Sequence, residues 1–440
     1  MYPNLYYVFK DWFGVEWNSL KFLNTFGLLV AISFIIAAWL LSLELKRREK
    51  QGLLLPKEQN IVVGKPASLI ELLTNAIIGF LFGFKFLGLL FDKPESISAQ
   101  AYIFSGQGSA VGGIFLATLL AGIKWWEKNK QKLKEPEKRI IRVWPHDRIG
   151  DIVVLGLVFG ILGAKLFDNL EHWDEFWADP IRRLFSQSGL AFYGGLILAT
   201  VAISWYSISK GIKLKYLVDA AAPALMFAYA VGRLGCQISG DGDWGIYNSA
   251  YISDNGGNVS LAKPGEFERA LEANKTYFLE GKVVSDSGLR YVTDRIYPTL
   301  SDVPHRSFKG PSFLPNWFFA YSYPQNVNDD GIIIPGIKDD HRSVLPQPVF
   351  PTPLYETILC TFLFFVFWFI RKKIKTPLVI FSIYLIFNGL ERLLIESIRV
   401  NDLHNFMGIK ATQAEFIALL LILTGAFLLG FAKSISRLVD

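Results

Sequence analysis

Nine apolar runs of about 20 residues dominate the sequence and restrict the folds open to the chain. A transmembrane β-strand would need ~10 residues of alternating polarity, a pattern that is absent here. The runs therefore predict an all-α polytopic membrane protein, with 51% hydrophobic residues in agreement. We place the helices at 22–43, 69–91, 106–126, 149–168, 189–207, 218–237, 354–370, 377–395 and 413–432.

Basic clusters after alternate runs predict the orientation. ELKRREK, the loop beginning KWWEKNK, KGIKLK, RKKIK and AKSISR each follow an odd-numbered run, whereas the opposite loops are poor in lysine and arginine. The positive-inside rule then places the N-terminus outside and the C-terminus in the cytoplasm. The same pattern assigns the net charge of +6 to cytoplasmic loops and argues against nucleic-acid binding.

Composition divides the chain into five stretches. Residues 246–353 are rich in Pro, Asn, Asp, Gly and aromatic residues, which predicts a partly β external head domain. Residues 1–43 form an external segment with the first helix, and 44–148 form an inserted helix pair with basic cytoplasmic loops. Residues 149–245 contain core helices with a signature motif, and 354–440 contain the C-terminal core helices.

Polar side chains gather at the predicted outer ends of several helices. Arg392, Glu396 and Arg399 have i, i+4, i+7 spacing and therefore share one helix face. Arg233 lies near the outer end of the sixth run. A further group falls at the same predicted depth: Lys165, Tyr193, Gly194, Gly195, Tyr355 and Glu356.

Arginines in such positions have two interpretations. Each could extend its guanidinium to the headgroups, or Arg392 could simply pair with Glu396. Alternatively, Arg233 and Arg392 bind an anionic phospholipid, because a guanidinium offers phosphate two parallel hydrogen bonds and keeps its charge. For Tyr193 alone, a place in the interfacial aromatic belt is the simpler alternative.

Metal binding has little support. Asp241 and Asp243 in GDGDWG lack the spacing of a calcium loop, and the five histidines are scattered. We therefore expect no metal and no other cofactor.

Several strings, in this order, resemble the prolipoprotein diacylglyceryl transferase family: GILGAKLF, SGLAFYGGLILA, VDAAAPALMFAYAVGRLGCQISGDGDWG, FPTPLYETIL and NGLERLLIESIRV. Gln413 resembles a glutamine found at the start of that family's last helix. The resemblance covers roughly 20–43, 149–245 and 346–432.

The resemblance implies transfer of diacylglyceryl from phosphatidylglycerol to the lipobox cysteine thiol of prolipoproteins, without a metal. It implies catalytic roles for Tyr193, Arg233, Arg392 and Glu396. The substrate-binding residues that it implies are Phe26, Lys165, Gly194, Gly195, Cys236, Asp241, Gly245, Tyr355, Glu356, Asn388 and Arg399.

Departures from the family pattern keep two alternatives open. Tyr193 stands where the family has a histidine, and a neutral phenol with a pKa of about 10 is a poor base. Cys236 and Ser239 stand at two asparagine positions, and either Asp241 or Asp243 could take the acidic place. The alternatives to the enzyme are a non-catalytic phospholipid-binding relative that acts through its external domain, and a lipid transporter.

Overall fold

The computed structural model describes residues 1–91, 102, 105–185, 191–285, 288–293, 295–401, 404–406 and 409–438. The chain forms two compact units. The first consists of Met1–Leu40 together with the chain from Val218 onward, and the second is Leu41–Leu217.

All nine predicted spans contain a long helix. They are α2 (Thr25–Lys50), α3 (Leu69–Phe82) with η2 (Gly83–Leu87) and α4 (Gly88–Phe91), α6 (Ala110–Lys130), α7 (Ile149–Glu171), α10 (Phe192–Ser209), α11 (Leu214–Ser239), α14 (Thr352–Ile370), α15 (Val379–Glu396) and α16 (Gln413–Leu438). In the described part of the chain, eight helices are long and apolar enough to cross a membrane; the helix at the remaining predicted span, α15, has three charged residues among its 18 and is not one of the eight. The prediction of a polytopic helical membrane protein is confirmed.

The helix ends differ from the predicted ends where polar residues continue a helix. Helix α2 extends to Lys50, seven residues beyond the apolar run. The continuation is stabilised because Glu44 pairs with Arg47 and, at 3.3 Å, with Arg48, at helical i+3 and i+4 spacings. The predicted start of the fifth span at 189 lies outside the described residues, and α10 begins at Phe192.

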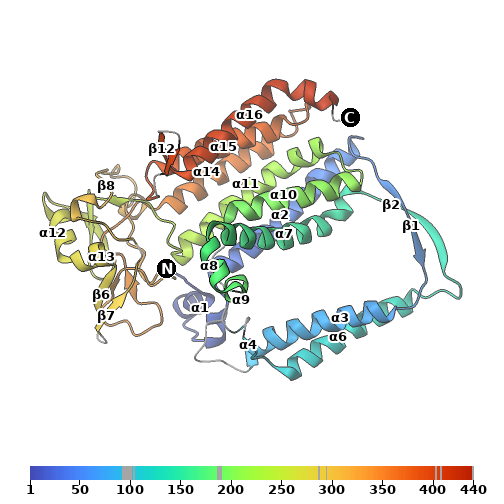
Figure 1. Cartoon of the computed structure of the whole chain (residues 1–440), viewed down its shortest axis with the longest axis horizontal. Helices are drawn as coiled ribbons and strands as arrows, with labels where there is room; N and C mark the ends of the chain where they lie inside the picture. Colours follow the sequence, from blue (N-terminus) through green and yellow to red (C-terminus); the bar gives the residue numbers. More distant parts are fainter. Residues whose placement is uncertain are drawn as a thin grey trace. The chain divides into compact units, whose positions relative to one another are not determined.

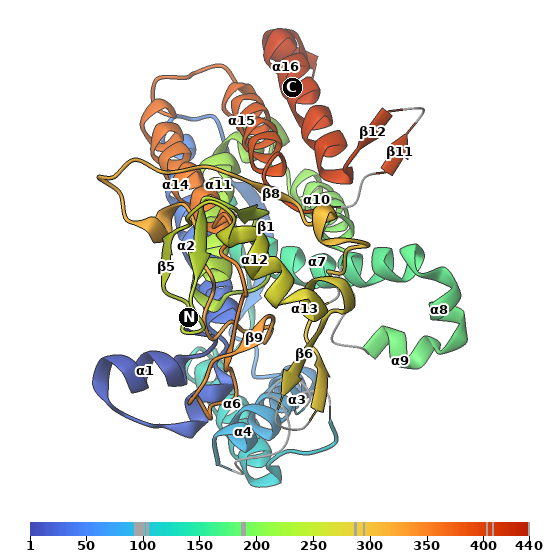
Figure 2. The same cartoon turned by 90° about the vertical axis from the view of Figure 1, so that its left-hand side faces the viewer.

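Helices α14, α15 and α16 lie side by side in the first unit (Figures 1 and 2). Close packing of α15 on α16 depends on glycine, since a Cβ at Gly389 would lie 2.6 Å from the carbonyl oxygen of Ala418. The buried carboxylate of Asp219, on α11, accepts hydrogen bonds from the backbone N–H groups of Leu378 and Phe381, at 3.0 and 2.9 Å. It therefore caps the beginning of α15.

The partly β character predicted for 246–353 is confirmed. Its strands form two-stranded sheets: β3 (Tyr247–Asn248) with β8 (His305–Arg306) in parallel, and antiparallel β4 (Tyr251–Ser253) with β5 (Val259–Leu261), β6 (Lys282–Ser285) with β7 (Gly288–Tyr291), and β9 (Ile332–Ile333) with β10 (Ser343–Val344). Short helices accompany them: α12 (Glu266–Ala273), α13 (Lys275–Glu280), η4 (Leu300–Asp302) and η5 (Asn316–Phe318). An aromatic core that includes Tyr247, Phe278 and Tyr323 holds this region together.

Smaller elements complete the first unit. Helix α1 (Leu5–Phe13) and the turn η1 (Asn18–Phe22) precede α2 and pack around Tyr6, Tyr7 and Leu20. Strands β11 (His404–Phe406) and β12 (Ile409–Ala411) form a hairpin between α15 and α16.

The second unit contains two helix pairs, α3 with α6 and α7 with α10 (Figure 1). An antiparallel ribbon of β1 (Lys57–Val63) and β2 (Glu137–Val143) leads to and from the first pair. The turn η3 (Pro145–Arg148) precedes α7, and the short helices α8 (Trp173–Ala178) and α9 (Pro180–Phe185) follow it.

Glycines set the distance between α7 and α10. A Cβ at Gly163 would lie 2.4 Å from the carbonyl oxygen of Gly194, and a Cβ at Gly194 would lie 2.3 Å from Cβ of Phe167. Gly195 is similarly close to the carbonyl oxygen of Gly160, at 2.6 Å. The two helices therefore approach through small residues, as expected of helices in lipid.

A valine at Gly163 is expected to lower the free energy of unfolding by about 2 kcal/mol or more, because the backbone of α10 leaves no room for the side chain. Thermal unfolding of the detergent-solubilised protein measures the change. Gly160→Val is the matched control, since a Cβ at Gly160 meets nothing within 4 Å. Equal stability of the two variants would contradict this packing.

Candidate functional site

Arg233 begins the site near the C-terminal end of α11. Its side chain is only 16% exposed, so it needs partners within the protein. Tyr229 lies one helical turn earlier on the same face, and the guanidinium carbon stands 5.5 Å from the centre of its ring. The arginine is thus held on one side by an aromatic ring.

Glu356, in the second turn of α14, joins two arginines from different helices. Its carboxylate is completely buried. Oε2 lies 3.3 Å from Nε of Arg233, and Oε1 lies 3.8 Å from Nη1 of Arg392. The hydroxyl of Tyr229 also donates to Oε1 over 2.8 Å. The two predicted phosphate-binding arginines therefore meet around one carboxylate.

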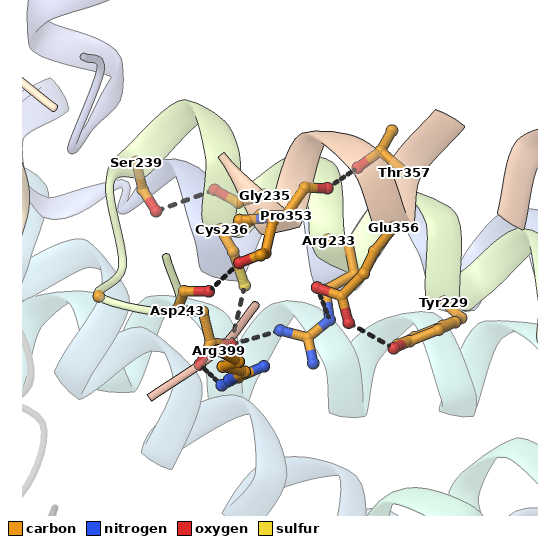
Figure 3. A network of polar contacts seen from close by, with 12 residues as sticks. Tyr229, Arg233, Gly235, Cys236, Ser239, Asp243, Pro353, Glu356, Thr357 and Arg399 are labelled. Carbon is orange, nitrogen blue, oxygen red and sulfur yellow. Dashed lines mark hydrogen bonds and ion pairs between the residues drawn. The ribbon is translucent and has the colours of Figure 1, made fainter. Parts of the chain in front are cut away.

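Asp243 joins Arg233 to a third arginine. Its two carboxylate oxygens pair separately with Arg233 and with Arg399. Figure 3 shows both guanidinium groups turned toward this carboxylate, with Glu356 on the other side of Arg233. Of the two acidic candidates left open by the sequence, the structure brings Asp243 to the arginines.

The loop that carries Asp243 is fixed to α14 and to the end of α15. The hydroxyl of Thr352 donates to the carbonyl of Asp243 over 2.8 Å, and the N–H of Gly245 donates to the carbonyl of Phe350 over 2.9 Å. A Cβ at Gly245 would lie 2.5 Å from the carbonyl oxygen of Ile398. Only glycine permits this approach, which aligns the loop with the backbone of Arg399.

Glu396 supports Arg392 across one turn of α15, as its i+4 spacing predicted. Oε2 of Glu396 lies 3.0 Å from Nη2 of Arg392, and the Glu396 side chain is almost completely buried. The side-chain amide of Asn401 donates to Oε1 of Glu396 over 2.6 Å. These contacts orient Arg392 toward Glu356.

The two aspartates of the loop differ in their electrostatic surroundings. Burial would raise the pKa of Asp243, but Arg233 and Arg399 outweigh it and hold that pKa below its usual value. Burial, followed by the nearby carboxylate of Asp243, raises the pKa of Asp241 to about 6. Asp243 is therefore the ionised partner of the arginines.

The remaining predicted residues of the first unit lie around this network without all joining it. The ring of Phe26 lies 3.1 Å from the position of a Cβ at Gly235, and Sγ of Cys236 lies 3.9 Å from Asp243. Asn388 lies one turn before Arg392 on α15. The hydroxyl of Tyr355 donates instead to the carbonyl of Phe318 over 2.7 Å. This bond anchors residues 246–353, called the head region below, to α14.

Tyr193, Lys165, Gly194 and Gly195 belong to the second unit. Tyr193 stands in the first turn of α10, and its ring packs edge-on against Phe192 at 5.5 Å. Lys165 lies on α7, in the stretch that packs against the start of α10. Both glycines have a packing role between these helices. The role of these four residues beside Arg233 stays a prediction.

Sequence reasoning missed several residues of the network, among them Tyr229 and Glu391. Tyr229 had a signal, because it lies four residues before Arg233. Glu391 had no such signal in the sequence, because it is the neighbour of Arg392 and no helical spacing connects it with the other site residues. In the structure its Oε2 lies 3.5 Å from the hydroxyl of Tyr229. A tyrosine hydroxyl therefore lies between two buried carboxylates.

Comparison with known sequences decides the family. The description of the matching family is "Prolipoprotein diacylglyceryl transferase", and the match covers residues 111–431. This is well over half of the 440 residues, and it contains all three arginines. The chain belongs to the prolipoprotein diacylglyceryl transferase family. The match begins within α6, so it includes part of the stretch 44–148 that the resemblance left out, and it does not include the resemblance at 20–43.

Individual relatives carry the name phosphatidylglycerol–prolipoprotein diacylglyceryl transferase. The protein of Leptospira interrogans (serovar copenhageni) is 32% identical over 23% of this chain and 39% of its own length. Those of Clostridium novyi and Vibrio vulnificus (strain YJ016) are 36% and 30% identical, over 24% and 31% of this chain and 42% and 52% of their own lengths. The chain thus spans about half or less of these relatives.

The site of this family member retains donors for an anion. Within the described residues, Nε of Arg392 and Nη1 of Arg399 are buried and make no hydrogen bond. A guanidinium uses such nitrogens to bind phosphate in a bidentate way. The arrangement can therefore hold an oxyanion while Glu356, Asp243 and Glu396 keep the arginines in place.

Replacement of Glu356 by alanine is expected to lower the free energy of unfolding by about 3–5 kcal/mol, because Arg233 and Arg392 would both lose a buried carboxylate and the cluster would carry one more uncompensated positive charge. Chemical unfolding in detergent measures the loss. Glu272→Ala is the control, since that residue is 65% exposed and its pair with Lys275 is expected to contribute less than about 1 kcal/mol. A comparable loss in both variants would refute the bridging role.

Asp241→Asn is expected to change the pH dependence of stability. The folded pKa of about 6 lies above the unfolded value, so the native state binds more protons and wild-type stability falls as pH rises from about 4 to 6. The variant lacks this fall and should gain stability over wild type at pH 7.5 but not at about pH 4. Thermal unfolding at both pH values measures the difference.

Asp254→Asn is the control, because the pKa of Asp254 is shifted in the opposite direction from that of Asp241. Hydrogen bonds, first from the side chain of Asn258, lower the pKa of Asp254. Its contribution to stability is therefore present above the unfolded pKa and is lost in acid. This variant should lose stability at neutral pH, and a gain there would contradict the electrostatic description.

Proposed function

We propose that the protein transfers diacylglyceryl from phosphatidylglycerol to the cysteine thiol of prolipoproteins, the first step of bacterial lipoprotein maturation. Membership of the family supports the proposal, as does the name that its relatives carry. The thiol comes from the lipobox of the substrate, so neither Cys236 nor Cys360 has to act as nucleophile. No cofactor enters the reaction.

The reaction balances without an oxidant or reductant. The substrate sulfur attacks the glyceryl carbon that carries the phosphate, a C–S bond forms, and the C–O bond to phosphate breaks. Its electron pair leaves on the phosphate oxygen, so glycerol phosphate departs with an additional negative charge. The proton lost by the thiol compensates for that charge. Stabilisation of the developing charge is the main task of such a site.

The convergence of Arg233 and Arg392 on Glu356 carries the proposal. Two guanidinium groups from different helices stand around one point, and Arg399 joins them through Asp243. A phosphodiester at this point would receive hydrogen bonds from nitrogens that the carboxylates do not use. Charge that grows on the leaving oxygen is then stabilised more strongly than the charge of the bound lipid.

The membrane setting follows from the loops. We propose the bacterial inner membrane, with the N-terminus outside and the C-terminus in the cytoplasm. The arginine site then lies at the outer end of α11, where phosphatidylglycerol enters sideways from the bilayer and the lipobox peptide approaches from outside.

One observation favours a second function, a phospholipid-binding relative without transfer activity. Tyr193 stands where a histidine would serve as base, and Cys236 and Ser239 replace asparagines. As a catalytic base, Tyr193 would have to act as a phenolate, which its ordinary pKa of about 10 disfavours. The arginine network would persist in such a protein.

A mass measurement separates the two functions. Purified protein is incubated with phosphatidylglycerol and a lipobox peptide, and the peptide is expected to gain one diacylglyceryl group. Arg233→Ala should lower the rate by a factor on the order of 100–1000, whereas the exposed Arg290→Ala should not change it. Lipid binding without any mass gain would favour the non-catalytic relative.

Two substitutions test Tyr193 as the base. Tyr193→Phe should lower the rate by about 100-fold, the effect of losing a general base. Tyr193→His should be more active than Tyr193→Phe, and it should stay active at lower pH than the wild type, because imidazole has a pKa of about 6.5. A full rate in Tyr193→Phe would exclude this role, while lipid binding would show that the protein is intact.

A further inference from the structure

The loop 240–245, which carries Asp243, is held by residues of the head region as well as by the membrane helices. Nη2 of Arg295 donates to the carbonyl of Gly242 over 2.6 Å. The same guanidinium lies over the ring of Trp244, with 5.5 Å between its carbon and the ring centre. Arg295 therefore contacts the residues immediately before and after Asp243.

A second part of the head region supports the same loop. The ring of Tyr323 packs against Trp244 at 4.9 Å, and its hydroxyl donates to the side chain of Gln237 on α11 over 2.8 Å. The N–H of Val327 donates to the carbonyl of Ser239 over 3.0 Å. Tyr323 is completely buried, so these contacts belong to the core of the first unit.

Two glycines make the loop dependent on such support. Gly240 and Gly242 have φ of +69° and +78°, in the left-handed region where glycine is favoured. A Cβ at Gly240 would lie 2.7 Å from Cβ of Asn326, and one at Gly242 would lie 2.4 Å from the side-chain nitrogen of Asn328. Asn326 and Asn328 of the head region thus pack directly against a loop whose glycines would otherwise allow many backbone conformations.

The bond to Gly242 acts directly on Asp243. The peptide unit is planar, so a fixed carbonyl at Gly242 also fixes the nitrogen of Asp243. Thr352 fixes the carbonyl of Asp243 from the other side. The direction of the Asp243 carboxylate, and hence its contact with Arg233 and Arg399, depends on both bonds.

We propose that the head region is a clamp on the arginine site, and that Arg295 is a positioning residue that acts through Asp243. The activity readout of this inference rests on the proposed function, but the clamp itself does not. Without Arg295 the loop gains freedom, Asp243 leaves its place between Arg233 and Arg399, and Cys236 beneath it is uncovered.

Thiol labelling tests the clamp without any catalysis. The sequence has two cysteines, so the full chain with Cys360→Ser leaves Cys236 as the single thiol, only 5% exposed. Addition of Arg295→Met should raise the rate at which a small maleimide labels Cys236 by about tenfold or more, the effect of losing one charge-assisted hydrogen bond. An unchanged rate would overturn the proposal.

Arg269→Met in the same background is the matched control. Arg269 also donates to a glycine carbonyl of the head region, that of Gly265 at 3.0 Å, but it is exposed on α12. Labelling of Cys236 in this variant should equal that of the parent. A matching increase in both variants would mean that the head region responds to any lost arginine, and the specific role of Arg295 would be refuted.

A double-mutant cycle tests whether Arg295 acts through Asp243. Arg295→Met should lower kcat by about tenfold, and combining it with Asp243→Asn should give no loss beyond that of Asp243→Asn alone. Arg295→Lys should recover part of the rate, since an ammonium can still donate to Gly242. Independent, multiplying losses would contradict the positioning role. If even the parent transfers no lipid, the proposed function fails, while the labelling result still decides the clamp.

Discussion

The sharing of buried carboxylates among arginines is the interaction on which the first unit depends. Glu356 lies between Arg233 and Arg392, and Asp243 lies between Arg233 and Arg399. Each carboxylate therefore connects elements that are far apart in sequence: α11, α14 and the end of α15. Charges in an apolar environment are tolerated only when they are paired, so the three segments must meet at this depth.

The same sharing explains how the arginine cluster can be stable and still offer donors to an anion. The carboxylates neutralise the arginines, which keeps the cluster compatible with the membrane. They leave some guanidinium nitrogens without a hydrogen bond among the described residues, namely Nε of Arg392 and Nη1 of Arg399. A phosphate that reached these donors would add hydrogen bonds while the existing pairs stay in place.

Much of this arrangement was predictable because its physical signals are local. Apolar runs predicted the helices, and i+4 spacing predicted the pairing of Arg392 with Glu396. The choice between Asp241 and Asp243 was not, because loop geometry decides it through contacts with Thr352 and Arg295. Nor could the sequence distinguish a glycine that faces a ligand from one that faces a helix, as at Gly194.

The cap on α15 determines where the charge of Arg392 lies along the helix. Asp219 binds the first turn of that helix, while Arg392 lies 14 residues after Leu378, about 21 Å along the axis at 1.5 Å per residue. A slip of one residue at the cap would displace the guanidinium by about 1.5 Å and turn it through about 100°. The carboxylate of Asp219, at the other end of α15, thus determines the position of the Arg392 guanidinium along the helix axis and its direction around that axis.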